Sequence, residues 1–420
     1  MTRRLPTIHR ITEHDAGPYR LERLDLEFSN GERRQFERLR GRGHGAVAVV
    51  PLLDAHTVLL VREYAAGLHR YELGLVKGRV DAGETALQAA DRELKEEAGY
   101  GARRLDVVRT VTLAPVYMSH ETTVVLARDL YPERLPGDEP EELEVVPWPL
   151  EAIGELALRE DVLAIAQDAA AAILEVYERD FEVVSKGDDS PLTDADLAAH
   201  RGIVAGLGRL TPDIPVLSEE SAHLVDVATR RRWHRLWVVD PLDGTREFVK
   251  RNGEFTVNIA LVENGVAVFG VIQAPVTGVL WHGAPGHGAF RRDGDGERAL
   301  HVRRPALSPL RVAASRSHLG PRTTALMARM GATETVGLGS SLKFCRIAEG
   351  GMDVYPRFGP TSEWDTAAGQ AILEAAGGAL LDPRGRPFRY NQRDTLLNGD
   401  FIALGDPALP WRDWLGPEAG

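Results

Sequence analysis

The sequence contains a single cysteine, Cys345, among its 420 residues. An intramolecular disulfide is therefore excluded, and we expect a small buried thiol in a protein of the reducing cytoplasm. No apolar run approaches the roughly 18 residues of a membrane-spanning helix, and the first residues, MTRRLPTIHRITEHD, lack the apolar segment of a secretory signal. We therefore expect a cytoplasmic protein with no membrane partner.

Positive charge is also scarce. Fifty lysines and arginines stand against 62 aspartates and glutamates, which gives a net charge of -12 at pH 7. Proteins that bind nucleic acid need clustered lysines and arginines facing the phosphate backbone, so we do not expect a nucleic-acid partner. Phosphorylated small molecules stay compatible with an acidic chain if metal ions neutralise the contact.

The length predicts two or three domains, and we place a border near Leu158, giving domains 1–157 and 158–420. Two β-rich apolar runs, GAVAVVPLL and HTVLLVREY, are separated by a short loop and predict a hairpin. TALQAADRELKEEAG predicts one helix capped by Gly99, and Pro149 to Arg179 is also helical. After the border, helices and strands alternate, and Asn264-Gly265 predicts a tight hairpin turn.

The predicted helix carries Glu93, Glu96 and Glu97 on one face. Residues three and four apart on a helix are neighbours, so these like charges repel one another. Such a cluster is tolerated on a solvated surface, or it holds a cation. Mg²⁺ prefers carboxylate oxygens, which makes the face a candidate magnesium site.

The surrounding stretch, GLVKGRVDAGETALQAADRELKEEAGY, resembles the Nudix box at every defining position. The resemblance covers roughly the first 155 residues and implies an α/β/α sandwich. It also implies that Glu93, Glu96 and Glu97 are metal ligands, with Glu97 contributing to catalysis. Arg92 would orient these carboxylates through charge-assisted hydrogen bonds.

LVKGRVDAGE and the later GDEPEEL resemble Nudix hydrolases of ADP compounds such as ADP-ribose, diadenosine polyphosphates and NADH. Relatives place a catalytic glutamate on the late acidic loop, which corresponds to Glu139 or Glu141, and we favour Glu139. The loop alone would also be consistent with a solvated acidic segment. A nucleotide sensor that binds without cleaving is a second alternative.

Acidic clusters recur in the second half: SKGDDSPLTDAD, VLSEES, WVVDPLDGTREF and SEWDTAAG. In VVDPLDGT, an apolar strand delivers Asp240 to its end, and Asp243 follows on the same turn. Each turn alone is common, but together the clusters supply several hard oxygen ligands of the kind that Mg²⁺ takes.

This order of motifs resembles the magnesium-dependent, lithium-sensitive inositol monophosphatase superfamily, from about residue 158 to the end. The resemblance implies layered α/β structure of the sugar-phosphatase type. Its implied metal ligands are Glu219, Asp240, the Leu242 carbonyl, Asp243 and Asp365. Asp196 and Thr245 would orient and activate the attacking water, and Glu220 would lie behind the ligands.

Within the superfamily, the motifs look most like 3′(2′),5′-bisphosphate nucleotidases, which convert adenosine 3′,5′-bisphosphate to AMP and phosphate. The implied substrate-binding residues are Gly244, Thr245, Ser340, Lys343, Arg357 and His318. Lys343 and Arg357 would bind the second phosphate, since arginine can grip a phosphate with two hydrogen bonds. An inositol-1-phosphate phosphatase is the alternative within the same class.

The sequence therefore predicts a bifunctional hydrolase that uses Mg²⁺, with Mn²⁺ as the alternative ion, at both sites. Small-molecule nucleotides are the expected partners. Both resemblances imply a homodimer.

Overall fold

The computed structural model describes residues 4–17, 19–41, 43–66, 70–112, 114–179, 183–185, 191–314 and 320–415. The chain forms two compact units, Met1–Ala157 and Leu158–Gly420. Helix α2, Ile153–Tyr177, begins in the first unit and continues in the second. No helix within the described ranges is long and apolar enough to cross a membrane.

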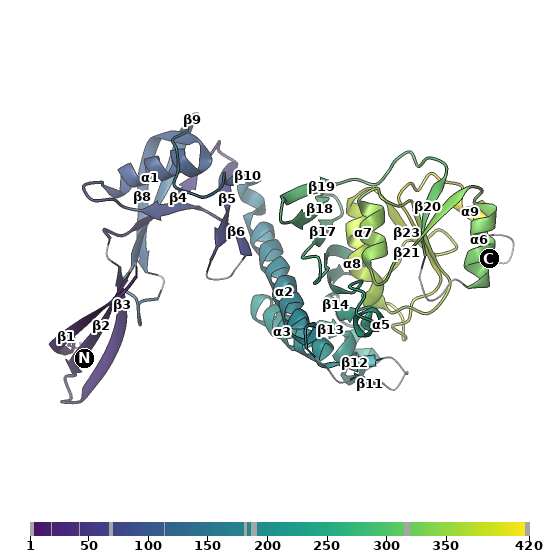
Figure 1. Cartoon of the computed structure of the whole chain (residues 1–420), viewed down its shortest axis with the longest axis horizontal. Helices are drawn as coiled ribbons and strands as arrows, with labels where there is room; N and C mark the ends of the chain where they lie inside the picture. The colour runs from purple at the N-terminus through teal and green to yellow at the C-terminus, as the bar shows by residue number, and fades with distance from the viewer. Residues whose placement is uncertain are drawn as a thin grey trace. The chain divides into compact units, whose positions relative to one another are not determined.

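The first unit contains three sheets (Figure 1). The amino-terminal sheet is an antiparallel meander of β1 (Thr7–Ala16), β2 (Tyr19–Glu27) and β3 (Arg33–Gly41). The second sheet has the order β10 (Glu144–Pro149), β5 (Thr57–Ala65) and β6 (Arg70–Gly74). The third has the order β7 (Val76–Arg79), β4 (Ala46–Pro51), β9 (Glu121–Pro132) and β8 (Tyr100–Thr112). A short 3-10 turn, η2 (Leu150–Ala152), precedes α2.

Helix α1, Ala86–Glu93, packs its apolar side against the third sheet. Ala90, Leu94 and Ala98 are buried in one core with Val47 and Val125, so they form the apolar side of this helical segment. Burying this face stabilises the helix that carries the clustered glutamates.

One local prediction for the first unit is wrong. The runs at β4 and β5 do not form a hairpin, since they belong to different sheets joined by one isolated bridge from Leu52 to Val58. Each run is buried and has strands on both sides, so apolar character predicted the strands but not their partners. The predicted helix and its Gly99 cap are confirmed: α1 continues into a π-helical turn, η1 (Leu94–Ala98), and Gly99 ends it with φ 75°.

The second unit is a stack of alternating helical and sheet layers (Figure 1). Its first sheet has the order β13 (Val216–Ser218), β14 (Arg235–Asp243), β15 (Thr256–Glu263), β16 (Val266–Gln273), β17 (Leu280–Ala284), β18 (Gly288–Asp293) and β19 (Gly296–Leu300). Its second sheet has the order β21 (Thr333–Gly337), β20 (Leu310–Ala314), β22 (Val354–Arg357), β24 (Phe401–Leu404) and β23 (Ala379–Leu381).

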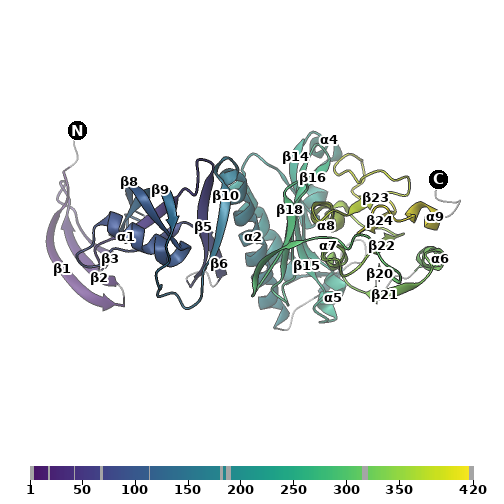
Figure 2. The same ribbon diagram turned by 90° about the horizontal axis from the view of Figure 1, so that it is seen from above.

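Helices cover both faces of each sheet. On one face of the first sheet lie α2 and α3 (Asp194–Leu210), and between the two sheets lie α7 (Leu342–Ala348) and α8 (Glu363–Ala375). The outer face of the second sheet is covered by α6 (Pro321–Arg329) and α9 (Trp411–Leu415) (Figure 2). Shorter elements are β11 (Val183–Ser185), β12 (Pro191–Thr193), η3 (Glu219–Leu224), α4 (Val227–Arg230) and α5 (Thr245–Val249).

The central helix α8 is seated very closely against its neighbours. A Cβ atom added to Gly270 on β16 would lie 2.4 Å from the carbonyl oxygen of Ala368, and one added to Gly369 would lie 2.4 Å from the Phe344 ring. Glycine at these positions lets sheet and helix backbones approach one another. Cys345 is buried on α7 in the same layer, and burial raises the pKa of its thiol.

The turn predicted at Asn264-Gly265 is confirmed. β15 and β16 pair as an antiparallel hairpin, and both turn residues have positive φ, 49° and 81°. This is the conformation for which Asn-Gly is preferred.

Candidate active sites

The first site is built where β7 meets α1 and η1. Thr85 caps α1: its hydroxyl accepts from the backbone N–H of Gln88, whose side chain accepts in return from the N–H of Thr85. This reciprocal cap fixes the start of the helix. Gly78 on β7 faces the other end, where an added Cβ would lie 2.0 Å from the Glu93 carboxyl carbon. Only glycine lets the strand pass this close to the carboxylate.

Arg92 holds three carboxylates together. Its guanidinium donates to Glu84 at 3.0 Å, to Glu93 at 2.9 Å and to Glu96 at 2.8 Å. These bonds raise the pKa of Arg92, with the bond to Glu84 contributing most. The orienting role expected for Arg92 therefore has its geometry in the structure.

Glu97 lies deepest of the three helix glutamates. The π-helical turn ends with the N–H of Gly99 donating to the Leu94 carbonyl, and Glu97 within that turn is buried. Burial, with a smaller effect from the charges of Glu93 and Glu63, raises the pKa of Glu97 to about 8. Its carboxylate accepts from the backbone N–H of Lys77 at 3.3 Å.

The late acidic loop closes the site. Glu93, Glu96 and Glu97 line a cavity of about 320 Å³ together with Glu139 and Glu141. Burial, then the charges of Glu63 and Asp138, raises the pKa of Glu139. Glu141 accepts a hydrogen bond from the Tyr71 hydroxyl, so it is held toward β6.

Sequence reasoning missed two side chains of this site. Glu63 on β5 is close enough to affect the pKa values of both Glu97 and Glu139. The Lys77 ammonium group pairs with Glu63 at 2.6 Å. Strand alternation in HTVLLVREY could have placed Glu63 on the half-exposed side, but nothing in the run indicated what it would face.

The second site begins where the antiparallel pairing of β14 becomes irregular. The register with β15 shifts between Asp240 and Asp243, and the Leu242 N–H donates to Asp240 at 3.1 Å. The chain then turns through Gly244 into α5. A carboxylate from η3, Glu219, and one from the first turn of α8, Asp365, face this turn closely enough to affect its pKa values.

Burial and the charges of this cluster raise the pKa values of its three aspartates. Burial, then the charges of Glu219, Asp243 and Asp365, raises the pKa of Asp240 well above its ordinary value. Burial raises the pKa of Asp243 to about 6, although the charge of Lys343 opposes the rise. Burial and the charge of Asp243 raise the pKa of Asp365 to about 8. Four carboxylates clustered around the buried Asp240 need a cation or shared protons.

Asp196 and Thr245 lie together beside this turn. Asp196, at the start of α3, accepts from the hydroxyl and the backbone N–H of Thr193 at 2.7 and 2.8 Å. Its other oxygen lies 3.4 Å from the Thr245 hydroxyl, which is also 3.2 Å from the Leu242 carbonyl. One hydroxyl hydrogen can serve only one of these acceptors at a time.

The predicted substrate-binding residues lie around a pocket of about 150 Å³ that also reaches Asp243 and Asp365. It includes Gly244, Ser340, Lys343 and Arg357. Lys343 is buried, donates to the Ser340 carbonyl at 2.5 Å, and has its pKa lowered by burial to about 8. Thr245 itself does not line this pocket, and the predicted His318 lies outside the described residues.

Three further side chains support the second site and were not singled out from the sequence. Asn258 donates to Asp243 at 3.3 Å and accepts from the Ser341 hydroxyl at 2.7 Å. His200 lies 2.8 Å from the hydroxyl of Ser218, and Ser218 directly precedes Glu219 and Glu220 in the chain. Isolated Asn, Ser and His residues are too common to indicate a site before the fold places them.

Both sites have the donor chemistry that fits Mg²⁺, namely hard carboxylate and carbonyl oxygens. Among the described residues, no three Asp, Glu, His or Cys side chains already converge in the geometry of a metal site. In the first site Arg92 neutralises Glu93 and Glu96, and in the second Glu219 and Asp240 are hydrogen-bonded to each other. Cation binding would therefore replace an internal partner at each site.

Both units of this chain are similar to known proteins. The model of the inositol monophosphatase family matches residues 158–404. The chain belongs to the inositol monophosphatase family. A 3′(2′),5′-bisphosphate nucleotidase CysQ of Salmonella typhimurium is 50% identical over 58% of this chain and 97% of its own length. The crystal structure of CysQ from Bacteroides thetaiotaomicron, a bacterial member of this family, matches with 44% identity and a TM-score of 0.52, over 58% of this chain and 95% of that one.

The first unit matches two further family models. A NUDIX domain matches residues 43–166, and a NudE-type Nudix hydrolase N-terminal domain matches residues 6–38. The crystal structure of an ADP compounds hydrolase aligns with 45% identity and a TM-score of 0.35, over 37% of this chain and 85% of that one. With the two Nudix models, this inositol monophosphatase family member is a fusion of two hydrolase domains, and both predicted folds are confirmed.

Proposed function

We propose that the second unit removes the 3′-phosphate of adenosine 3′,5′-bisphosphate and releases AMP and phosphate. The observation that carries this proposal is the buried cation Lys343 beside the carboxylates of Asp243 and Asp365 in one pocket. A phosphatase for a single phosphate needs the carboxylates, whereas a second phosphate needs a further cation. Relatives that are 50% and 48% identical are 3′(2′),5′-bisphosphate nucleotidases, which supports the same substrate.

Five groups would hold Mg²⁺ in the second site: the carboxylates of Glu219, Asp240, Asp243 and Asp365, and the backbone carbonyl of Leu242. When bound, Mg²⁺ screens the phosphate oxygens and polarises the attacking water. Water then attacks phosphorus, the bond to the 3′-oxygen breaks, and that oxygen leaves with a proton. No covalent bond to the protein is needed.

Thr245 and Asp196 would manage the proton of the attacking water. The Thr245 hydroxyl is within 3.4 Å of Asp196, whose second oxygen is already fixed by Thr193. We assign Thr245 as the group that orients the water and Asp196 as the acceptor of the hydroxyl proton. Gly244 and Ser340 would line the substrate, and Lys343 and Arg357 would bind the 5′-phosphate. His318 stays a predicted substrate ligand.

For the first unit, we propose hydrolysis of the diphosphate in ADP compounds, such as ADP-ribose, diadenosine polyphosphates and NADH, to AMP products. Glu93, Glu96 and Glu97 would hold Mg²⁺, and the cavity that they share with Glu139 supports a catalytic role for that loop residue. The raised pKa makes Glu139 a stronger base than an ordinary glutamate. The NudE-type amino-terminal match agrees with the resemblance of LVKGRVDAGE and GDEPEEL to hydrolases of ADP compounds.

The decisive experiment measures both activities on the full chain, in Mg²⁺, for wild type, Glu97→Gln and Asp243→Asn. The substrates are ADP-ribose, NADH, diadenosine tetraphosphate, adenosine 3′,5′-bisphosphate and inositol 1-phosphate. Each substitution removes one metal-binding charge, so we expect a loss of about 100-fold or more in the affected activity only, equivalent to roughly 3 kcal/mol of barrier.

Three outcomes would contradict parts of the proposal. Faster phosphate release from inositol 1-phosphate would make the second unit an inositol phosphate phosphatase. Cation-dependent nucleotide binding without turnover would make the first unit a sensor. Indifference of the second activity to millimolar Li⁺ would argue against the proposed metal arrangement, since the resemblance implies lithium sensitivity.

A further inference from the structure

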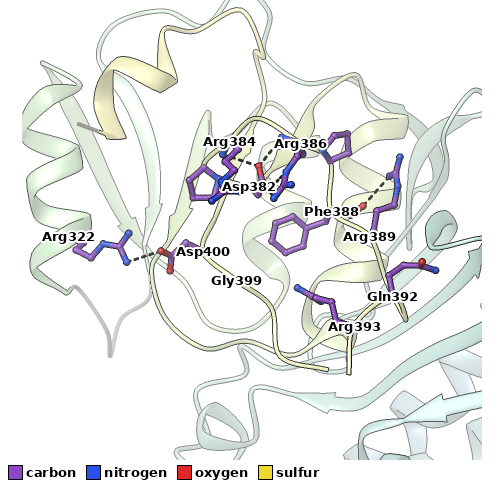
Figure 3. A pocket seen from close by; sticks show the side chains of 12 residues that line it. Arg322, Asp382, Arg384, Arg386, Phe388, Arg389, Gln392, Arg393, Gly399 and Asp400 are labelled. Carbon is purple, nitrogen blue, oxygen red and sulfur yellow. Dashed lines mark hydrogen bonds and ion pairs between the residues drawn. The ribbon is translucent and has the colours of Figure 1, made fainter. Parts of the chain in front are cut away.

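A cavity of about 720 Å³ lies in the second unit and is unconnected with the proposed reactions (Figure 3). It is formed by the start of α6, the segment from Asp382 to Arg393 and the loop before β24. Among the described residues, none of those lining it also lines the pocket of Lys343. Its volume is within the range of sites for small molecules.

Arginine dominates the wall of this cavity. Five arginines line it against two aspartates: Arg322, Arg384, Arg386, Arg389 and Arg393, with Asp382 and Asp400. The whole chain has a net charge of -12, so the charge of this wall is opposite to that of the protein. Like charges gathered on one wall repel one another unless an anion lies between them.

Three of the arginines have partners that explain them. Arg322 pairs with Asp400 at 2.7 Å, Arg386 pairs with Asp382 at 2.7 Å, and Arg393 donates to Glu363 at 3.1 Å. The Arg322–Asp400 pair joins the start of α6 to the loop before β24, whereas the Arg386–Asp382 pair lies within one segment (Figure 3). A structural role accounts for Arg322 and Arg386, and for the Nη2 group of Arg393.

The same explanation fails for Arg384 and Arg389. Neither guanidinium makes an ion pair within 4.0 Å with a residue in the described ranges. Arg389 donates to the neighbouring Phe388 carbonyl at 3.1 Å, and its charge only acts on the pKa of Glu374, which lies outside the cavity wall. In addition, the Nε of Arg393 is buried without a hydrogen-bond partner among those residues. The cavity therefore presents donors that its own acidic residues do not satisfy.

Arginine donors in this number suit phosphate better than a carboxylate. A guanidinium binds phosphate oxygens through two parallel hydrogen bonds, and several guanidinium groups can share one chain of phosphates. The Phe388 ring on the same wall adds an apolar surface. We propose that this cavity binds a small di- or triphosphate compound at a site separate from both hydrolytic centres.

The test measures binding of inorganic tripolyphosphate to the full chain by titration calorimetry, in EDTA and low salt. EDTA removes the divalent cations on which both proposed catalytic sites depend. Wild type is compared with Arg384→Gln/Arg389→Gln and with a charge-matched control, Arg209→Gln/Arg311→Gln, on exposed arginines of the same unit. We expect the first variant to bind at least tenfold more weakly, and the control to bind within twofold of wild type.

Equal binding by all three proteins, or no binding to wild type, would overturn the proposal. ATP and AMP extend the test: tighter binding of ATP than of tripolyphosphate would identify a nucleotide site, and equal binding would identify a site for the phosphate chain alone. Retained hydrolysis of adenosine 3′,5′-bisphosphate shows that each variant is folded. If the double variant does not fold, the exposed Arg384→Gln alone is used, with Arg209→Gln as its control and at least a threefold loss expected.

Discussion

At the scale of single residues, the two sites balance the negative charge of their carboxylates in different ways. The first site gathers glutamates around one arginine, Arg92, whose hydrogen bonds reach three carboxylates. The second site has a buried lysine, Lys343, whose pKa is lowered, next to aspartates whose pKa values are raised. Each arrangement is suited to bind an anionic substrate together with a metal cation.

Lys343 tests the assignment of the second phosphate. We expect Lys343→Met to lower kcat/KM for adenosine 3′,5′-bisphosphate by roughly 10- to 100-fold, because one charge-assisted hydrogen bond contributes about 1.5–3 kcal/mol. The rate with 3′-AMP, which lacks the 5′-phosphate, should change less than threefold. A parallel loss with both substrates would instead assign Lys343 to the reacting phosphate.

Gly78 tests the close approach of β7 to the glutamate cluster. In Gly78→Ala, the new methyl group would meet the Glu93 carboxyl at 2.0 Å, and the flexible side chain would swing away. We therefore expect a folded protein with at least tenfold weaker Mg²⁺ activation of ADP-ribose hydrolysis and unchanged phosphatase activity. Normal Mg²⁺ activation would show that Glu93 is not a ligand.

At the scale of elements, a buried ionic network ties α2 to the first sheet of the second unit. Arg292 on β18 donates to Glu160 of α2 at 2.9 Å and to Glu297 of β19 at 2.6 Å. His282 on β17 lies 2.9 Å from Glu297, and we assign its proton to the facing nitrogen. Burial alone would raise the pKa of Glu297, but His282 and Arg292 outweigh it and hold that pKa well below the ordinary range.

Glu297→Gln should therefore destabilise the second unit. Breaking a buried pair leaves Arg292 partly uncompensated, so we expect a loss of about 3 kcal/mol and roughly 6–12 °C in Tm. A depressed glutamate pKa stabilises the folded state above the ordinary value of about 4.3 and loses that effect as the pH falls below it. Calorimetry of wild type and variant should show a large difference at pH 7 that shrinks below pH ~4.

The same scale shows what the sequence could and could not predict. Hydrophobic periodicity located most strands and helices, and Asn264-Gly265 predicted its hairpin because the local backbone demands those residues. Strand partners depend on long-range packing, which is why β4 and β5 were joined incorrectly. The carboxylates that we expect to bind metal were chosen because their motifs resemble known families, and that assignment stays a prediction. Glu63 and Asn258 became visible only when separate strands brought them to the sites.

At the scale of the whole molecule, each unit has its own hydrophobic cores. We therefore expect residues 1–157 and 158–420, produced separately, to keep their own proposed activities within about threefold of the full chain. Activity assays and circular dichroism of the two fragments check this. Loss of both activities on separation would mean that folding of each unit needs the other. The homodimer stays a prediction, to be checked by light scattering of the full chain.

The tight seating of α8 has a consequence for protein engineering. Asp365 sits on the first turn of a helix that Gly270 and Phe344 hold from two sides, without room for one extra methyl group. Gly270 makes none of the proposed substrate contacts. Replacing it with a larger residue would nevertheless shift α8 and so displace Asp365 in the pocket. Mutagenesis libraries that keep only the acidic motifs unchanged would therefore overlook the effect of Gly270 on turnover.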